Sequence, residues 1–206
     1  MIFAGMEVVS LVDYPKEVAT TVFTQGCNIN CAYCHNKSLI PVKVPEQGLQ
    51  ESEVITRLVD NIDKIKHLVI TGGEPGIHPK GVLDFIYEVK MKMPTMKIKV
   101  DTNGTNSDFV RRLVSCTDFL ALDYKGPMGP IGDYDSEWRK SLEYSRMFID
   151  HEVRLTLYPP YFPKTIEQWR SLAIGLLRDS NVVLQQYRPV GDEFDVTPYD
   201  EGTIED

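Results

Sequence analysis

Three of the four cysteines of the chain, Cys27, Cys31 and Cys34, lie within eight consecutive residues, and the fourth, Cys116, stands alone. A disulfide framework needs spaced pairs, and this layout offers none, so metal binding in a reducing compartment is the better interpretation. Three thiolates in one short loop are close enough to bind a single compact metal centre. The sequence therefore predicts a metal site at Cys27, Cys31 and Cys34.

The number of thiolates separates two kinds of metal centre. A 4Fe-4S cluster normally has four cysteine ligands, so three would leave one iron open to chelate the amino and carboxylate groups of a methionine. If the sulfur of that methionine carries a third substituent, and is therefore a sulfonium, an electron could pass to it and break a carbon–sulfur bond. The alternative is a zinc site completed by Cys116 or His35. Structural zinc sites usually pair two short ligand knuckles, and Cys116 has no such partner, so the cluster is favoured and Cys116 is expected in the core.

Six short apolar runs alternate with segments that carry apolar residues at helical spacing, such as residues 54–62 and 82–93. This alternation predicts βα units and an α/β fold of parallel strands. With six units instead of eight, we expect a partial (β/α)6 barrel that resembles an incomplete TIM barrel. The predicted strands are Val18–Phe23, His67–Thr71, Lys97–Asp101, Phe119–Asp123, Glu152–Leu157 and Val182–Gln186.

Polar and glycine-rich residues follow the carboxyl ends of these runs, which is the face where barrels of parallel strands assemble their active sites. We therefore expect one site to collect them. In chain order they are the cysteine loop, Gly72-Gly73-Glu74-Pro75, Asp101-Thr102, Asp123 with Lys125, and Arg188.

Composition sets limits on the partners. The net charge of −8 and the absence of dense lysine and arginine clusters argue against nucleic-acid binding. No segment is long and apolar enough for a membrane span, and the first residues lack a signal peptide, so we expect a cytoplasmic protein that does not bind membranes. The length predicts one domain over residues 1–206, with a core at about 18–188 and an acidic surface tail at 189–206.

The cysteine loop, from Thr24 to Asn36, has an aromatic residue before the third cysteine and His-Asn after it. It resembles the cluster loop of glycyl-radical-enzyme activating enzymes in the radical S-adenosylmethionine superfamily. The segment Ser10-Leu11-Val12-Asp13-Tyr14-Pro15 is similar to the N-terminal signature of anaerobic ribonucleoside-triphosphate reductase activating proteins. With Gly72-Gly73-Glu74-Pro75 and Leu184-Gln185-Gln186-Tyr187-Arg188-Pro189, the resemblance covers nearly the whole chain.

The resemblance implies roles for the residues that follow the second, third and fourth strands. Gly72, Gly73 and Glu74 would bind the amino group of the methionyl part of S-adenosylmethionine. A monovalent cation near Asp101-Thr102 and Asp123 would lie beside the methionyl carboxylate, which Lys125 would meet directly. For Asp101 the alternative is an Asx-turn at the start of a loop.

Four more residues are candidates for the cofactor site. The resemblance places the backbone of Tyr33 to His35 against the adenine, although these residues could simply shape the loop. Arg154 could reach the cofactor or solvate a sheet edge. Arg188 stands where a better-known branch of the activating enzymes has a histidine near the adenosine, and an arginine could stack on the adenine instead.

The function that the resemblance implies is reductive cleavage of S-adenosylmethionine to a 5'-deoxyadenosyl radical. That radical would remove hydrogen from a glycine Cα of a glycyl-radical enzyme, here anaerobic ribonucleotide reductase, with a flavodoxin- or ferredoxin-type electron donor. Chain length agrees, since it leaves no residues for a substrate-capping domain and no cysteines for an auxiliary cluster. The alternatives are a radical enzyme acting on a small molecule, such as a deazapurine synthase, and a zinc-stabilised interaction module without catalysis.

Overall fold

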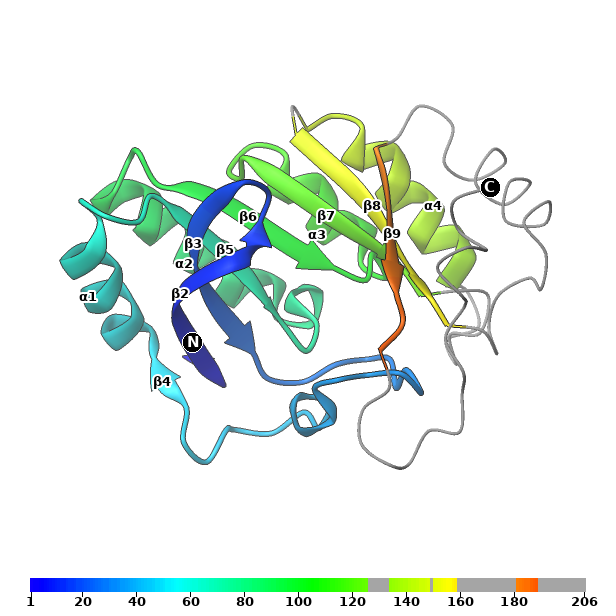
Figure 1. The fold of residues 1–206 in the computed structure, drawn as a ribbon, viewed down its shortest axis with the longest axis horizontal. Coiled ribbons are helices and arrows are strands. Elements are labelled where there is room, and N and C mark those ends of the chain that lie inside the picture. The colour runs from blue at the N-terminus through cyan, green and yellow to red at the C-terminus, as the bar shows by residue number, and fades with distance from the viewer. Residues whose placement is uncertain (126–133, 149, 159–180, 189–206) are drawn as a thin grey trace.

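The computed structural model describes residues 1–125, 134–148, 150–158 and 181–188, and is built on a curled, seven-stranded sheet (Figure 1). The six strands from β3 to β9 are parallel to their neighbours, whereas β2 pairs antiparallel with β3 at one edge. All six predicted strands are confirmed, in a half-barrel. In sheet order the strands are β2 Gly5–Tyr14, β3 Glu17–Thr24, β5 His67–Gly72, β6 Lys97–Thr102, β7 Phe119–Tyr124, β8 Asp150–Leu157 and β9 Val182–Gln186.

Helices connect the parallel strands from β3 to β8 and pack against one face of the sheet (Figure 1). They are α1 Glu51–Asn61, α2 Pro79–Lys92, α3 Ser107–Leu113 and α4 Tyr134–Ser145. Pro79 occupies the first turn of α2, as its fixed φ favours. The remaining elements are a two-stranded sheet of β1 Ile2–Phe3 with β4 Leu49–Gln50, and the 3-10 turns η1 Lys37–Leu39 and η2 Pro75–Ile77.

The two faces of the central strands have different chemistry. On β6, Ile98 and Val100 pack in the core beneath the helices, whereas Lys99 and Asp101 alternate with them and face the other way. On β7, Leu120 belongs to the same core and Asp123 faces the concave side. Strand alternation therefore places charged side chains on the inner surface of the half-barrel while burying apolar ones outside it.

Strand β2 was not predicted from the sequence. Its pairing with β3 shifts register on both sides of Ser10, whose Oγ accepts hydrogen bonds from the backbone N–H groups of Val12 and Asp13. Leu11 and Val12 are 74% and 88% exposed, so this strand lacks the alternation that marks a half-buried strand. The interrupted register explains why this segment was recognised from the sequence only as a motif and was not predicted to be a strand.

Helix α3 is capped by Asn106, whose side-chain oxygen accepts a hydrogen bond from Phe109 N. The predicted tail at 189–206 lies outside the described residues. None of the helices within the described ranges has the length and apolar character needed to cross a membrane.

Candidate active site

A cavity of about 750 Å³ opens at the carboxyl ends of the parallel strands. Its wall brings together residues that are distant in sequence, from the cysteine loop to the end of β9. The residues to which the sequence assigned cluster or cofactor binding all line it: Cys27, Cys31, Tyr33, Cys34, His35, Gly72, Gly73, Glu74, Asp101, Thr102, Asp123, Lys125, Arg154 and Arg188. The structure brings these residues to one cavity, and the roles assigned to them there stay predictions.

The three thiols belong to the loop after β3. Cys27, Cys31 and Cys34 are free and partly exposed, and Cys34 N donates a 3.1 Å hydrogen bond to Cys31 O, which tightens the turn between them. Burial raises the pKa of Cys27 to about 11. Burial also raises the pKa of Cys31, against the opposing charge of Lys125. Burial therefore favours the protonated form of Cys27 and Cys31, and a metal that binds them must displace these protons.

The glycine-rich turn after β5 packs directly on the backbone that precedes Cys27. Gly73 N donates to Thr24 O at 2.9 Å, and Glu74 N donates to Gly26 O at 2.8 Å. A Cβ on Gly73 would lie 2.0 Å from Gly26 O, and Gly72 has a φ of +117° that favours glycine. Both glycines are needed for the two loops to approach so closely.

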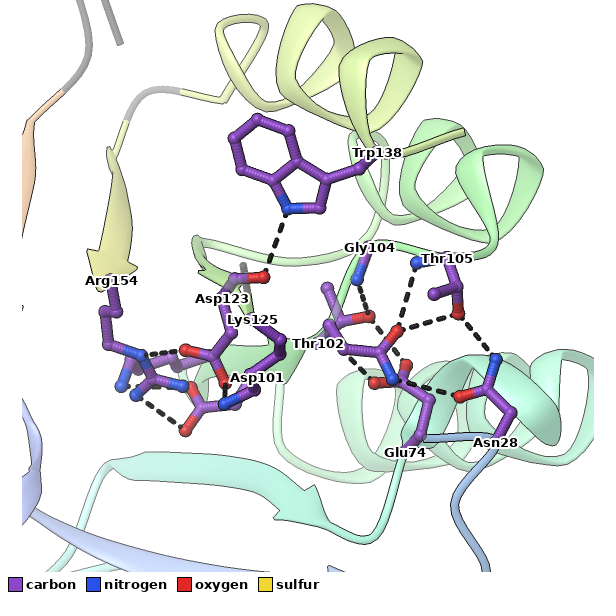
Figure 2. Close-up of polar contacts among 12 residues, drawn as sticks. Asn28, Glu74, Asp101, Thr102, Gly104, Thr105, Asp123, Lys125, Trp138 and Arg154 are labelled. Carbon is purple, nitrogen blue, oxygen red and sulfur yellow. Dashed lines mark hydrogen bonds and ion pairs between the residues drawn. The ribbon is translucent and has the colours of Figure 1, made fainter. Parts of the chain in front are cut away.

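The Glu74 carboxylate is 2% exposed and holds neighbouring loops together (Figure 2). Its oxygens accept hydrogen bonds from Gly76 N, Thr102 Oγ1 and Asn103 N at 2.6 to 2.7 Å. Burial raises the pKa of Glu74 to about 7, against these hydrogen bonds. The sequence assigned this side chain to an ammonium group. Oε1 accepts two of these hydrogen bonds and Oε2 one, so the carboxylate, which lines the cavity, keeps acceptor capacity on Oε2 and that assignment stays a prediction.

Arg154 bridges the two carboxylates at the ends of β6 and β7 (Figure 2). Its Nε lies 2.7 Å from Asp123 Oδ1, and one of its terminal nitrogens lies 3.0 Å from Asp101 Oδ2. On the other oxygen of Asp123, Lys125 Nζ donates at 2.8 Å. Arg154 is largely buried and does not solvate a sheet edge, so that interpretation is wrong.

The pKa values follow from this alternation of charges. Burial raises the pKa of Asp123, but the positive charges of Arg154 and Lys125 outweigh it and hold the pKa well below its usual range. Burial likewise opposes the charge on Arg154, whose pKa is nevertheless raised by Asp101 and Asp123. A monovalent cation was expected because two carboxylates facing one cavity repel each other. The guanidinium of Arg154 already supplies positive charge between them.

Lys99 extends the charged series and was not anticipated from the sequence. It is 2% exposed, and its Nζ lies 3.0 Å from Asp101 Oδ1 and 3.8 Å from Glu152 Oε1. It also donates a 2.6 Å hydrogen bond to the backbone oxygen of Asp13 in β2. One buried ammonium therefore links three strands. The available signal was its position two residues before Asp101, on the same strand face.

A model of the radical S-adenosylmethionine (SAM) superfamily matches residues 21–170. The chain belongs to the radical SAM superfamily. The family implies a 4Fe-4S cluster and S-adenosylmethionine. The donor set fits such a group, because three thiols line one large cavity with ion-paired groups beside them. In the described parts of the chain, no three His, Cys, Asp or Glu side chains are arranged to bind a single metal ion.

Three curated relatives carry different functional names. A Methanocaldococcus jannaschii protein grouped by name with glycyl-radical enzyme activating enzymes is 32% identical over 127 residues, covering 59% of this chain and 49% of the relative. An anaerobic ribonucleoside-triphosphate reductase-activating protein from Pasteurella multocida is 29% identical, covering 45% and 65%. A 7-carboxy-7-deazaguanine synthase from Clostridium acetobutylicum is 27% identical, covering 50% and 44%. The chain spans about half the length of the first relatives it matches.

The fold is similar to that of a solved structure over almost the full length of this chain. QueE from Escherichia coli superposes with a TM-score of 0.61 at 19% identity, covering 99% of this chain and 88% of that one. At this identity the likeness concerns the fold alone.

The far end of the cysteine loop reaches β9. The Tyr33 ring packs against Tyr158 at 5.1 Å between centroids, and Tyr158 packs against Tyr187 at 5.0 Å. His35 Nε2 lies 3.0 Å from the backbone oxygen of the exposed Arg188. Tyr33 therefore helps to fix the loop, as its alternative interpretation proposed, and the same contacts bring His35 and Arg188 to one part of the radical SAM cavity.

Other polar residues of the site were missed as functional candidates. Asn103 Nδ2 donates to Asn28 Oδ1 at 3.0 Å, and Asn28 Nδ2 donates to Thr105 Oγ1 at 2.7 Å, which ties the cysteine loop to the loop after β6 (Figure 2). Val12 and Asp13 of β2 also line the cavity. The signal for Asn28 and Asn103 was their place beside Cys27 and Thr102 in loops that follow strands.

Cys116 lies away from the cavity. It is 9% exposed in the core that contains Phe109 and Leu113, and its thiol lies within 3.7 Å of the backbone oxygens of Arg112 and Leu113. The prediction of a core residue is confirmed, and the zinc site that Cys116 would complete does not form.

Proposed function

We propose that this radical SAM protein generates a glycyl radical on a partner enzyme, anaerobic ribonucleoside-triphosphate reductase. One observation carries the proposal: the three thiols and the Asp101, Asp123 and Arg154 group line the same cavity, beside residues Val12 and Asp13 of the segment that resembles reductase activating proteins. The names of the relatives from M. jannaschii and P. multocida support it.

When bound, the cluster and S-adenosylmethionine supply a 5'-deoxyadenosyl radical that can remove a hydrogen atom. In this proposal Cys27, Cys31 and Cys34 hold the cluster. Lys125, which faces the cavity beside Asp123, binds the methionyl carboxylate through a charge-assisted hydrogen bond. Gly72 and Gly73, with Glu74 fixing the turn, bind the methionyl ammonium group.

The adenosine end of the cofactor takes the residues at the other end of the loop. The Tyr33 to His35 backbone would lie against the adenine, with Arg188 able to stack on it. Asp101 and Thr102 complete the wall. We assign the positive charge between Asp101 and Asp123 to Arg154 in place of a bound monovalent cation, because its guanidinium contacts both carboxylates.

The same proposal includes an electron donor and a cellular compartment for the protein. A flavodoxin- or ferredoxin-type protein would supply the electron. The free thiols suit a reducing compartment such as the cytoplasm. A net charge of −8 does not favour nucleic acid as a partner.

The proposal is tested by supplying the reduced, cluster-loaded protein with S-adenosylmethionine and a reductase whose loop glycine is deuterated at Cα. With unlabelled reductase we expect a glycyl doublet by electron paramagnetic resonance, split by the remaining α-hydrogen. With the deuterated reductase we expect this doublet to collapse to a narrower signal and deuterium to appear in 5'-deoxyadenosine. Specificity requires the target hydrogen to be held within contact of the 5' carbon, so label transfer reports direct abstraction. A glycyl radical without label transfer, or no glycyl radical at all, would contradict the proposal.

A second candidate is a small-molecule radical SAM reaction. It is favoured by the relative named 7-carboxy-7-deazaguanine synthase, which aligns over 50% of this chain. Incubating the protein with a metabolite extract discriminates the two functions. Consumption of a small molecule, without glycyl radical formation on the reductase, would establish this second function.

A further inference from the structure

A second cavity, of about 600 Å³, lies beside the cysteine loop, and its lining within the described ranges has no residue in common with that of the active-site cavity. Its walls come from the chain that follows the cysteines and from the start of α2, and they include Val42, Lys43, Val44, Pro79 and Lys80. We call this cavity the basic groove.

The backbone of the cysteine loop separates the basic groove from the active site. Gln25 lines the groove and Cys27 lines the active-site cavity. Their Cα atoms are two residues apart and so lie within about 7.6 Å of each other. Val42 packs against the glycine between them, since a Cβ on Gly26 would lie 3.3 Å from Val42 Cγ2. The groove therefore approaches the first cysteine from outside the active-site cavity.

The groove has the anatomy of a protein-binding surface. Val42 and Val44 are each 71% exposed in it, and the ammonium groups of Lys43 and Lys80 border them. An apolar centre with a charged rim is typical of interfaces between proteins. Among the residues that the structure describes, no aspartate or glutamate lines the groove, although acids outnumber bases by 30 to 22 in the chain.

The two lysines are free to exchange partners. Lys43 pairs with Glu46 and Lys80 with Asp84, within three or four residues along the chain, and all of these side chains are exposed. Exposed pairs of this kind contribute little to stability. Carboxylates of a docking protein could therefore replace Glu46 and Asp84 at small cost.

We propose that the basic groove is the docking site of an acidic one-electron carrier protein. The inference rests on the proposed radical SAM function, which requires an electron from outside. One electron leaves the reduced carrier and enters the oxidised cluster, and no atoms are transferred. A partner whose glycine must reach the active-site cavity approaches different lining residues, so carrier and partner can bind at once. Lysines on the rim favour an acidic protein and speed its association.

The test measures the affinity of a purified acidic flavodoxin for the protein, by titration, in a variant with both Lys43→Glu and Lys80→Glu. The matched control carries Lys92→Glu and Lys140→Glu, two exposed lysines with the same kind of local ion pair, and changes the net charge equally. We expect the groove variant to bind about tenfold more weakly or worse at low salt, and the control to change by less than about twofold. At high salt the difference should shrink.

Activity with two reductants separates this inference from the proposed function. With dithionite, the groove variant should make 5'-deoxyadenosine at the wild-type rate, and with reduced flavodoxin it should lose most of that rate. Equal weakening of flavodoxin binding in the groove and control variants would overturn the docking site. So would a groove variant that binds flavodoxin normally but fails to activate the reductase, or one that alters only self-association. Wild-type protein inactive with dithionite would instead contradict the proposed function.

Discussion

At the residue scale, the pairing of Arg154 with two buried carboxylates makes it the most sensitive side chain of the site. Arg154→Met leaves Asp101 and Asp123 without their shared partner, and we expect a loss of about 3–5 kcal/mol in the free energy of unfolding. Arg154→Lys keeps the charge but not the fork, so an intermediate loss is expected. Denaturant unfolding measures both.

The control for this prediction is Arg111→Met, because Arg111 is exposed and pairs with Asp108, three residues away on the same helix. Its effect should stay within about 0.5 kcal/mol. Affinity for S-adenosylmethionine, measured by calorimetry, should fall in both Arg154 variants and not in the control. Equal stabilities of the Arg154→Met and Arg111→Met variants would show that the bridge does not stabilise the fold.

The iron content of four single Cys→Ala variants should separate the three predicted cluster ligands from Cys116. Replacing Cys27, Cys31 or Cys34 with Ala should abolish the cluster after anaerobic reconstitution, since each thiol lines the cavity. Cys116→Ala should retain it and lose about 1 kcal/mol of stability, because Cys116 is a small core residue. Iron and sulfide analysis is the measurement. A Cys116→Ala protein without iron would restore the four-ligand interpretation.

At the element scale, the contact between the cysteine loop and the turn after β5 depends on the absence of a side chain at Gly73. Gly73→Ala would place a Cβ 2.0 Å from Gly26 O, so the loops must separate. We expect lower stability by about 2 kcal/mol or more and impaired cluster retention. In Gly81→Ala, where the added Cβ meets only Met1 atoms at 3.5 Å or beyond, helix propensity should raise stability by about 0.5–1 kcal/mol. Thermal unfolding of the two variants tests these opposite signs.

Asp118 joins helix α2 to strand β6 and gives a prediction about pH. It accepts hydrogen bonds from Lys90 Nζ, Lys97 Nζ and Ile98 N at 2.6 to 2.9 Å. Burial raises the pKa of Asp118, but the two lysines outweigh it and the pKa lies below the ordinary value of 3.8. Asp118→Asn should therefore cost about 1.5–3 kcal/mol at neutral pH.

The sign of the pH effect follows from the lowered pKa of Asp118. The unfolded chain binds this proton more readily, so the stabilisation is present above pH 3.8 and is lost as the pH falls through the folded pKa. The difference between wild type and Asp118→Asn should therefore narrow below about pH 4. Urea unfolding over a pH series measures it, and a difference that stays constant into strong acid would contradict the assignment.

The elements also show what could be predicted and why the rest could not. The six parallel strands were predictable because each is a short apolar run and segments with apolar residues at helical spacing separate the runs. Strand β2 was not, because Leu11 and Val12 are both exposed beside register shifts. The inward charges show the same limit. From sequence alone, a lysine within a strand, such as Lys99, is taken for a surface residue, because the strands that face it are not known. Likewise, Thr102 and Asn103, which donate hydrogen bonds to the Glu74 carboxylate, lie far from Glu74 along the chain.

At the scale of the whole molecule, Lys99 on β6 links edge strand β2, which pairs with β3, to strands on the far side of the sheet. Lys99→Met removes the donor to Asp13 O and leaves Asp101 and Glu152 with less compensating charge. We expect faster amide hydrogen exchange throughout β2 and a loss of about 3 kcal/mol or more in global stability. Lys97→Met, on the same strand at a largely exposed position, is the control and should leave β2 exchange unchanged. Partial rescue by Lys99→Arg would distinguish lost charge from altered packing.

The inward-facing charges have a consequence for how this chain can vary over evolutionary time. Lys99 and Asp101 share a face of β6, and Asp123 and Arg154 stand opposite each other on β7 and β8. Because side chains alternate along a strand, inserting or deleting one codon within β6, β7 or β8 would turn that strand's charges into the apolar layer under the helices. Descendants of this gene should therefore gain or lose residues in the segments that connect the strands. Substitutions within these strands should keep charged residues at the positions that face inward and apolar residues at the positions that face the helices.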